Sequence, residues 1–307
     1  MEHANRYFSL SHGSYEPSDS EKQWILYVME QEYEPSRWNL PTDFLGYDNF
    51  TRALTRLEMG SSPGYPYQRE KPTVGEWLRY DGVGFDTFAV ARLWMDVCTV
   101  FEGSWDTVLR VFVKQEPHTT KKAQEKRWRL IMASPLCVQV AWHMLFDFHN
   151  DKEISCFNRI PSQQSISLPA GEWKRFLATW KTSGTLHGMD KSAWDWTAPF
   201  WALMLDVEFR YRMGRGTGME LWKEKANILF RQMFESVKII LSDGSMYKQV
   251  VPGIMKSGCV CTISTNGHCQ GFAHVVACLK AGVGYQPMPP VVGDDTLIHP
   301  LHKCTVD

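Results

Sequence analysis

The spacing of apolar and polar positions predicts a chain of mixed helices and strands, with the clearest elements near the C-terminal end. A helix is expected from about residue 262, because apolar positions 263, 272, 275, 276 and 279 keep helical spacing as far as Gly282, a typical C-terminal stop. Beyond it, residues 291–298 form two short apolar runs around Gly293-Asp294-Asp295, a pattern that predicts a β-hairpin with carboxylates at its tip. Thr262 and Asn266 are four residues apart and so project from one face of the expected helix. A polar helix start beside a carboxylate turn is suited to binding a nucleotide and its metal ions.

The earlier part of the chain shows further periodic segments. Helices are expected after Ser18, over 85–101 and 134–153, from about residue 170 and from Phe200, strands over 111–113 and from residue 186, a loop over 213–218, and a hairpin over 237–251. Asp190 and Asp195 come directly after the strand that begins at residue 186. An aspartate at the end of a core strand is costly to bury unless it is compensated, and a divalent cation would compensate it.

Composition allows one large domain or two, since 307 residues with 44% hydrophobic content can bury a substantial core. Thirty-three basic and 34 acidic side chains give a net charge of −1, so the whole chain carries no nucleic-acid signature. Residues 110–129 are the exception, with seven Lys or Arg and two Glu. Within them, Arg127 and Arg129 alternate along an expected strand and would face the same way, as suits a triphosphate.

A loop at residues 60–67 contains two glycines and two prolines. Such a loop has a fixed shape, and a ligand could approach its backbone closely. Taken alone, it is more typical of an ordinary surface turn.

Eight scattered cysteines, the lack of a secretory leader and the lack of a bilayer-length apolar run favour a reduced intracellular protein. One group of side chains raises the question of zinc: Cys259, Cys261, His268, Cys269, His274 and Cys278. It contains no Cys-x2-Cys pair. Cys259 and Cys261 fall within the polar segment 257–266, and the other four have the helical spacing of buried residues. We therefore expect them to serve packing.

Three acidic or polar motifs stand in a fixed order: Asp190-x4-Asp195, then Ser257-Gly258-x3-Thr262-x3-Asn266, then Gly293-Asp294-Asp295. They resemble motifs A, B and C of the palm of viral RNA-dependent RNA polymerases. Lys114-x-Glu116 with residues 127–131 is similar to motif F, and residues 61–66 are similar to motif G. The amino-acid sequences of residues 112–118, 126–131 and 190–196 especially resemble those of the sobemovirus and polerovirus group. A lone Gly-Asp-Asp is a weak signal, whereas five motifs in order across residues 60–298 are specific.

The resemblance implies an α+β right-hand polymerase fold with fingers and palm, the palm being an antiparallel sheet flanked by helices. Expected fingers segments are 1–145, with motif G near 61–66 and motif F near 110–131, and the return segment 239–254. Expected palm segments are 146–238 with motif A and 255–307 with motifs B and C. Few residues follow Asp295, so a thumb is not expected. Without a thumb, we expect this chain to bind RNA but not to synthesise it processively.

The resemblance also implies roles for individual residues. Asp190, Asp294 and Asp295 would be catalytic ligands of Mg²⁺, with Mn²⁺ as a substitute. Nucleotide binding would fall to Lys114, Arg127, Arg129, Asp195, Ser257, Gly258, Thr262 and Asn266, and template binding to Ser62, Gly64, Lys121, Lys122 and Lys126. The implied partners are RNA template, nascent RNA, nucleoside triphosphates and other viral replication proteins. The implied location is a membrane-associated replication complex in the host cytoplasm, without a transmembrane segment in this chain.

Two other functions remain open from the sequence. A reverse transcriptase shares the palm and its carboxylates, but more typically has an aromatic residue two positions before the aspartate pair and a bulky residue at the 2′ position. Here Val292-Gly293 precedes the aspartates, and Asp195 with Asn266 favours ribose. The other alternative is a non-catalytic RNA-binding fragment, which metal-dependent nucleotide incorporation would distinguish from an enzyme.

Overall fold

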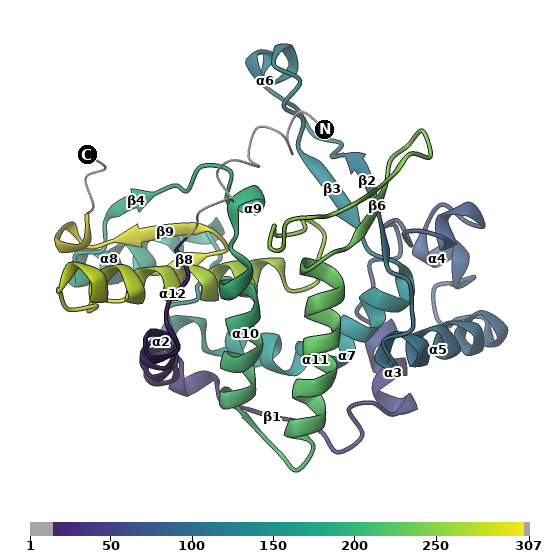
Figure 1. The fold of residues 1–307 in the computed structure, drawn as a ribbon, viewed down its shortest axis with the longest axis horizontal. Coiled ribbons are helices and arrows are strands. Elements are labelled where there is room, and N and C mark those ends of the chain that lie inside the picture. The colour runs from purple at the N-terminus through teal and green to yellow at the C-terminus, as the bar shows by residue number, and fades with distance from the viewer. Residues whose placement is uncertain (1–14, 304–307) are drawn as a thin grey trace.

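Helices and small sheets alternate along the chain, in the α+β class expected from the sequence (Figure 1). The computed structural model describes residues 15–303; the outer ends of the expected first and last segments, residues 1–14 and 304–307, lie outside the described residues. The helices are α2 (Asp19–Glu32), α3 (Tyr47–Leu54), α4 (Val74–Trp77), α5 (Thr87–Phe101), α6 (Thr120–Gln124), α7 (Leu136–Cys156), α8 (Trp173–Ser183), α9 (Trp194–Thr197), α10 (Phe200–Met213), α11 (Met219–Phe234) and α12 (Thr262–Ala281). The strands are β1 (Trp38–Asn39), β2 (Val108–Val113), β3 (Leu130–Ala133), β4 (His187–Met189), β5 (Gly214–Arg215), β6 (Lys238–Ile240), β7 (Met246–Lys248), β8 (Val291–Val292) and β9 (Asp295–Ile298).

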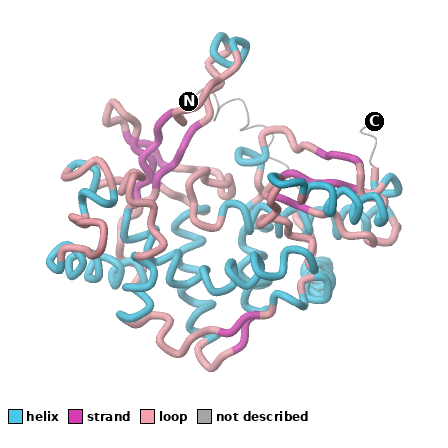
Figure 2. The backbone as a smooth tube through the Cα atoms, turned by 180° about the vertical axis from the view of Figure 1, so that it is seen from behind, coloured by secondary structure: helices cyan, strands magenta, loops and turns pink. Residues whose placement is uncertain are grey.

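Two sheets carry the segments that the motifs occupy. The first has the order β3-β2-β6-β7, in which β6 runs parallel to β2 and forms a hairpin with β7. The second has the order β4-β9-β8 and is antiparallel throughout. Figure 2 shows these sheets on opposite sides of the molecule, with helices between and below them. The chain therefore holds the basic segment and the acidic turns on separate sheets.

Local sequence signals explain several element boundaries. Helix α2 begins with a capping box, in which the Ser18 side chain accepts from the Glu21 amide and the Ser18 amide donates to Glu21 Oε2 at 2.8 Å. Helix α12 begins at Thr262 and ends at Ala281, and Gly282 caps its C-terminus with a φ of 66°. The expected β8–β9 hairpin is present, and Gly293, with a φ of 62°, occupies its turn.

One expected loop contains a strand. Residues 213–218 include β5, which pairs in parallel with β1 through the partners Trp38 and Gly214. The pair is only two residues long, so no alternation of apolar positions could have indicated it. At Gly214 a Cβ would lie 3.1 Å from the Trp38 ring and 2.3 Å from the flexible end of the Met219 side chain.

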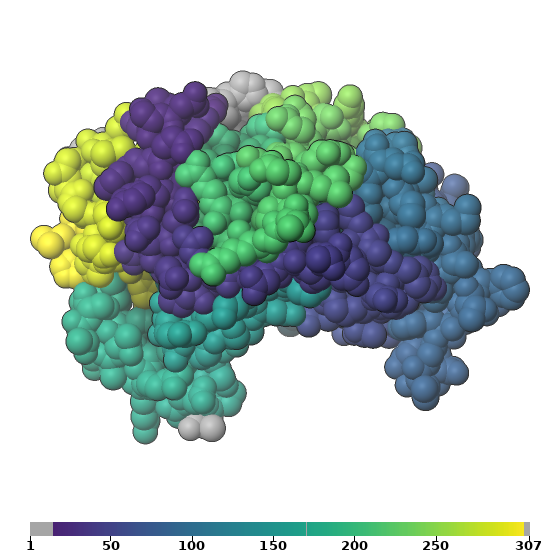
Figure 3. Space-filling view, turned by 90° about the horizontal axis from the view of Figure 1, so that it is seen from below, coloured from purple at the N-terminus to yellow at the C-terminus, as the bar shows by residue number. Residues whose placement is uncertain are grey.

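A helical layer of α2, α7, α10, α11 and α12 supports both sheets. Helix α10 packs against α11, α12 and α2, and α2 also packs against α12. Figure 3 shows the N-terminal elements running across the underside of the molecule. No helix among residues 15–303 has both the length and the apolar character needed to cross a membrane.

A fully buried ionic network joins three of these helices. Asp206 and Arg210 come from α10, Glu153 from α7 and His268 from α12, and all four have 0% exposure. Arg210 Nε donates to Asp206 Oδ2 at 2.9 Å, and the His268 ring contacts Asp206 Oδ1 at 2.6 Å on one side and Glu153 Oε1 on the other. Burial alone would lower the pKa of His268, but Glu153 and Asp206 raise it above its usual value. Two carboxylates therefore face an imidazolium and a guanidinium.

The network also fixes the rotation of α12. Arg210 Nη2 donates to Ser264 Oγ at 2.8 Å, and Thr265 Oγ1 donates to Asp206 Oδ2 at 2.7 Å. Ser264 and Thr265 directly precede Asn266 of motif B. Because buried polar groups must be paired, α12 is held in one rotational position against α10.

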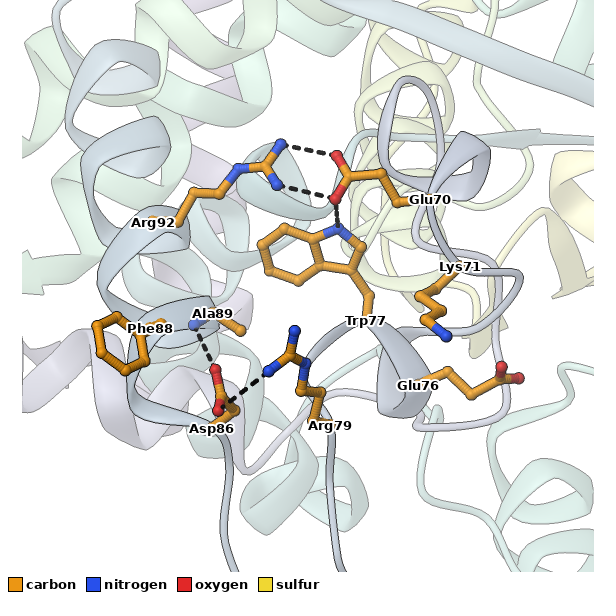
Figure 4. Close-up of a pocket in the computed structure, with 9 residues that line it drawn as sticks. All are labelled: Glu70, Lys71, Glu76, Trp77, Arg79, Asp86, Phe88, Ala89 and Arg92. Carbon is orange, nitrogen blue, oxygen red and sulfur yellow. Dashed lines mark hydrogen bonds and ion pairs between the residues drawn. The ribbon is translucent and has the colours of Figure 1, made fainter.

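A surface pocket lies between α4 and α5 (Figure 4). Two guanidinium nitrogens of Arg92 bind the two carboxylate oxygens of Glu70 at 2.8 and 2.7 Å, and Trp77 Nε1 donates to the same carboxylate at 3.2 Å. Because Glu70 and Arg92 satisfy each other, we interpret this pocket as a packing feature.

Replacing Arg210 by Met should destabilise the protein strongly, because two buried carboxylates would then share one imidazolium. Breaking a buried ion pair in this way costs about 3–5 kcal/mol. Arg212→Met is the matched control, since Arg212 lies on the same helix and pairs with Glu208 and Glu30 at a partly exposed surface. The control should cost about 1 kcal/mol or less. Urea unfolding measures both, and equal losses would contradict the structural role of the network.

Candidate active site

Strand pairing brings the three predicted metal-binding aspartates together. Strands β4 and β9 pair with Met189 opposite Thr296, so Asp190 and Asp295 are the next residues along the two antiparallel strands. Asp294 lies in the turn that joins β8 to β9. A strand end and a hairpin tip thus present carboxylates from positions about 100 residues apart in the sequence.

The electrostatics of this cluster favour a cation. Burial raises the pKa of Asp294, and the nearby carboxylates of Asp195, Asp295 and Asp190 raise it further. Lys191 is the nearby basic side chain, and its Nζ donates to Thr296 Oγ1 at 3.0 Å. Burial lowers the pKa of Lys191 to about 8, even though Asp294, Asp190 and Asp295 oppose that shift. Carboxylate oxygens that repel one another fit a hard divalent ion, which Mg²⁺ would be.

Ser257 joins the acidic cluster to the sheet that carries the basic segment. Its side chain donates a hydrogen bond to Asp195 Oδ2, and its carbonyl accepts from the Met132 amide at 2.8 Å. Gly258 follows with a φ of 113°, and a Cβ there would lie 3.0 Å from the Met132 carbonyl. The expected small turn is therefore present, and only glycine can adopt its geometry without strain.

Asn266 and Thr262 are closer to the protein interior than a direct nucleotide contact would suggest. Asn266 is 3% exposed, and its Oδ1 accepts from Trp194 Nε1 at 2.8 Å. Thr262 Oγ1 donates to the Cys259 carbonyl at 2.7 Å, as expected for a residue at a helix start. Asn266 thus holds Trp194, the residue before Asp195, and can affect Asp195 only through this neighbour.

The basic residues of motif F are already paired with acids. Glu116 accepts from Lys114 Nζ at 2.9 Å and from Arg129 Nη1 at 2.8 Å, and Arg127 binds Glu125 at 2.5 Å. The prediction that Arg127 and Arg129 alternate along a strand is wrong, because β3 begins only at Leu130.

The backbone of this segment makes other bonds. The Arg127 amide donates to the Lys122 carbonyl at 2.8 Å and the Arg129 amide to His118 Nε2 at 3.1 Å, which closes the loop around α6. Arg127 therefore forms its ion pair with Glu125 inside that loop, whereas Arg129 and Lys114 both form ion pairs with Glu116.

The residues predicted to bind template lie in two places. Lys121, Lys122 and Lys126 are exposed on and beside α6, which projects from the top of the molecule in Figure 1. Ser62 Oγ accepts from Arg110 Nη1 at 3.3 Å and is partly exposed. Gly64 is buried instead, and a Cβ on it would lie 2.1 Å from the Ser134 carbonyl. The close backbone approach expected at Gly64 is thus made by the protein's own chain.

Sequence reasoning missed three residues of the site. Trp194 binds Asn266, and Lys191 binds Thr296 and interacts electrostatically with the carboxylates. A buried indole N–H needs an acceptor, so the Trp beside Asp195 was a usable signal. Lys191 and Thr296 are 105 residues apart, and only the β4–β9 register brings them together.

Comparison with known proteins gives relatives by sequence and by fold, although no family model matches the chain. The replicase polyprotein P2AB of Southern bean mosaic virus is 36% identical over 195 residues, covering 62% of this chain and 19% of the polyprotein. Protein P1-P2 of Potato leafroll virus is 31% identical over 293 residues, covering 84% of this chain and 26% of that protein. The RNA-directed RNA polymerase of Mushroom bacilliform virus is 31% identical over 190 residues, covering 60% of this chain and 44% of the polymerase.

A solved structure extends the comparison to nearly the whole chain. The Sicinivirus 3Dpol RNA-dependent RNA polymerase superposes with a TM-score of 0.71 at 17% identity, covering 97% of this chain and 63% of that protein. The chain spans about a fifth of the length of the P2AB polyproteins that it matches. It is a sequence relative of the sobemovirus and polerovirus replicases and has the right-hand fold of a viral RNA-dependent RNA polymerase.

Proposed function

We propose that this chain supplies the fingers and palm for template-directed RNA synthesis in the replication of a positive-strand RNA virus. The observation that supports this most directly is the convergence of Asp190, Asp294 and Asp295 at the β4–β9 pair and the β8–β9 turn. The relatives named replicase or RNA-directed RNA polymerase, and the polymerase fold, support the same reaction.

Asp190 and Asp294 would be the principal ligands of Mg²⁺, or of Mn²⁺ in its place, with Asp295 as a supporting carboxylate. A bound pair of such ions activates the 3′ oxygen of the growing strand and stabilises the leaving pyrophosphate. The chain's own task is to hold three mutually repelling carboxylates at one place before the metal arrives. Burial raises the pKa of Asp294, and the neighbouring carboxylates raise it further, as such repulsion predicts.

Arg129 and Lys114 would bind the triphosphate by exchanging their bonds with Glu116 for bonds to phosphate oxygens. Arg127 would assist from the α6 loop. Asp195 faces the cluster with its carboxylate bonded to Ser257 and would accept a hydrogen bond from the ribose 2′-hydroxyl. Gly258 would let the loop move as the site closes, and Thr262 and Asn266 would position Ser257 and Trp194.

We assign residues 1–145 and 239–254 to the fingers, and 146–238 and 255–307 to the palm. This division is supported by β6, which returns to pair with β2, and by β4, which pairs with β9 across the palm motifs. RNA template, nascent RNA, nucleoside triphosphates and other viral replication proteins would be the partners. We propose a membrane-associated replication complex in the host cytoplasm as the location.

Replacing Asp294 by Asn should abolish incorporation on a primed RNA template with Mg²⁺, because it removes a ligand charge at constant side-chain volume. Metal ions contribute several kcal/mol to such transition states, so the loss should be at least about a hundredfold. Asp243→Asn is the matched control, since Asp243 also lies in a hairpin turn, between β6 and β7. It should keep full activity.

The same variant separates catalysis from folding. Without metal, Asp294→Asn should melt at the wild-type temperature or above it, because a repelled charge is removed. The rise in melting temperature on adding Mg²⁺ should disappear. Normal incorporation by this variant would overturn the metal assignment.

Asp195→Ala and Asn266→Ala should weaken the use of ribonucleotides more than of deoxyribonucleotides. Losing a buried hydrogen-bond partner costs about 1–3 kcal/mol, which corresponds to roughly ten- to a hundredfold in the ribose preference. Asn227→Ala on α11 is the control, since that amide donates only to the Lys223 carbonyl in its own helix. Equal losses for both sugars would show that Asp195 and Asn266 merely support the fold. A preference of the wild-type chain for deoxyribonucleotides would instead favour the reverse transcriptase alternative.

The exposed lysines of α6 should bind RNA backbone. Lys121→Ala combined with Lys122→Ala should weaken binding of single-stranded RNA regardless of its sequence. The slope of log affinity against log salt should fall by about 1.4, at about 0.7 for each lost phosphate contact. Lys174→Ala with Lys181→Ala on the exposed helix α8 is the control pair and should leave the slope unchanged. An equal change of the salt slope in both double variants would contradict a specific role of α6 in template binding.

A further inference from the structure

Two histidines and a cysteine meet at the C-terminal half of α12. His274 and Cys278 are one turn apart on α12, and His302 comes from the short 3-10 helix Pro300–His302 that follows β9. One donor atom from each of the three lies within 4.8 Å of the other two. Cys278 is 4% and His302 9% exposed, so the group is largely shielded from solvent.

The spacing within the group is close to that of ligands on one ion. His274 Nε2 lies 3.7 Å from Cys278 Sγ. Two donors bound tetrahedrally to zinc, at about 2.05 Å for nitrogen and about 2.3 Å for sulfur, are about 3.6 Å apart. The His274 and His302 ring centroids lie 4.7 Å apart with their planes at 74°, so the rings do not stack and can converge on one point.

Backbone carbonyls orient both imidazole rings. His302 Nε2 donates to the Gly284 carbonyl at 2.9 Å, and in the neutral ring this places the lone pair on Nδ1. Metal-binding histidines commonly donate their other ring nitrogen to a carbonyl in this way. His274 Nε2 donates to the Tyr285 carbonyl at 2.7 Å, a bond that it would exchange for the metal.

We propose that His274, Cys278 and His302 bind a zinc ion, with Cys278 as the thiolate after losing its proton. Two imidazoles and a thiolate select zinc over Mg²⁺, so this site would be chemically distinct from the carboxylate cluster. A cavity of about 480 Å³ adjoins the group and is lined by Gln270, Cys278 and His302, among others. Water from this cavity would complete the four ligands that zinc prefers.

The zinc would connect the two segments that carry motifs B and C. His274 and Cys278 belong to the same helix as Asn266, and His302 lies four residues beyond the end of β9, which begins at Asp295. A metal at this place would hold the C-terminal half of α12 against the end of the catalytic hairpin. The expectation that His274 and Cys278 serve only packing is thereby revised, because His302 supplies a third donor that helical spacing could not indicate.

Zinc content and a cobalt spectrum test the site without reference to polymerase activity. The purified chain is loaded with Zn²⁺, separated from free metal by gel filtration and analysed by mass spectrometry for zinc per chain. Wild type and Asp294→Asn should each retain one zinc ion, whereas Cys278→Ser and His302→Ala should retain none. Cys98→Ser is the matched control, since Cys98 lies on α5, and should keep its zinc. The melting temperature should rise with Zn²⁺ only in the proteins that retain it.

The Co²⁺-loaded protein provides a readout that misfolding cannot imitate. Wild type should show the visible bands of tetrahedral cobalt together with a thiolate charge-transfer band, which Cys278→Ser should lose. His302→Cys should keep the metal and intensify the thiolate band, because one ligand replaces another. The proposal is overturned by wild type that retains no zinc, by zinc retained in Cys278→Ser, or by loss of metal in His302→Cys. Failure of RNA synthesis alone would concern the carboxylate site and leave this result unaffected.

Discussion

The buried network of Asp206, Arg210, Glu153 and His268 is the constraint on which the geometry of the site depends. Two carboxylates without access to water can stay ionised only while the guanidinium and the imidazolium face them, as the lowered pKa of Asp206 and the raised pKa of His268 indicate. That requirement fixes α7, α10 and α12 relative to one another. Helix α10 follows motif A and α12 carries motif B, so the network sets the distance between the two motifs.

The site next to this network combines two kinds of charged group. Its carboxylates repel one another, whereas cations of the basic segment are paired with glutamates. Carboxylates gather at the β4–β9 edge, while Glu116 pairs with Lys114 and Arg129, and Glu125 pairs with Arg127. Ser257 joins the two regions, since its side chain binds Asp195 and its carbonyl accepts from Met132 on β3. A metal-bound triphosphate would complement both regions at once, because the ions neutralise the carboxylates and the phosphates take the place of Glu116.

Local signals in the sequence predicted the elements that present the motifs. The capping box at Ser18, the C-terminal Gly282 and the Gly293 turn are all properties of neighbouring residues, and the structure confirms each of them. Features that depend on distant partners could not be predicted in this way. Arg127 and Arg129 leave the strand because their amides bond to Lys122 and His118.

Part of the site could not be predicted from the sequence because its hydrogen-bond partners are far apart along the chain. The acceptor of the Trp194 indole is 72 residues away, and the partners of Asp206 come from its own helix α10 and from α12. His268 looked like one more buried ring among the cysteines and histidines of α12, yet it carries charge between two acids. Such pairs follow from helix packing, which the spacing of apolar positions does not specify.

The central claim is that Asp190 and the Asp294-Asp295 turn share one metal ion, and metal-directed backbone cleavage tests it most directly. Fe²⁺ replaces Mg²⁺ at oxygen-rich sites, and with ascorbate and peroxide it generates radicals that cut the chain close to the bound ion. We expect fragments that end near residue 190 and near residue 294 in equal yield, and their suppression by excess Mg²⁺. Cleavage near only one of these positions, or cleavage that Mg²⁺ does not suppress, would contradict the account.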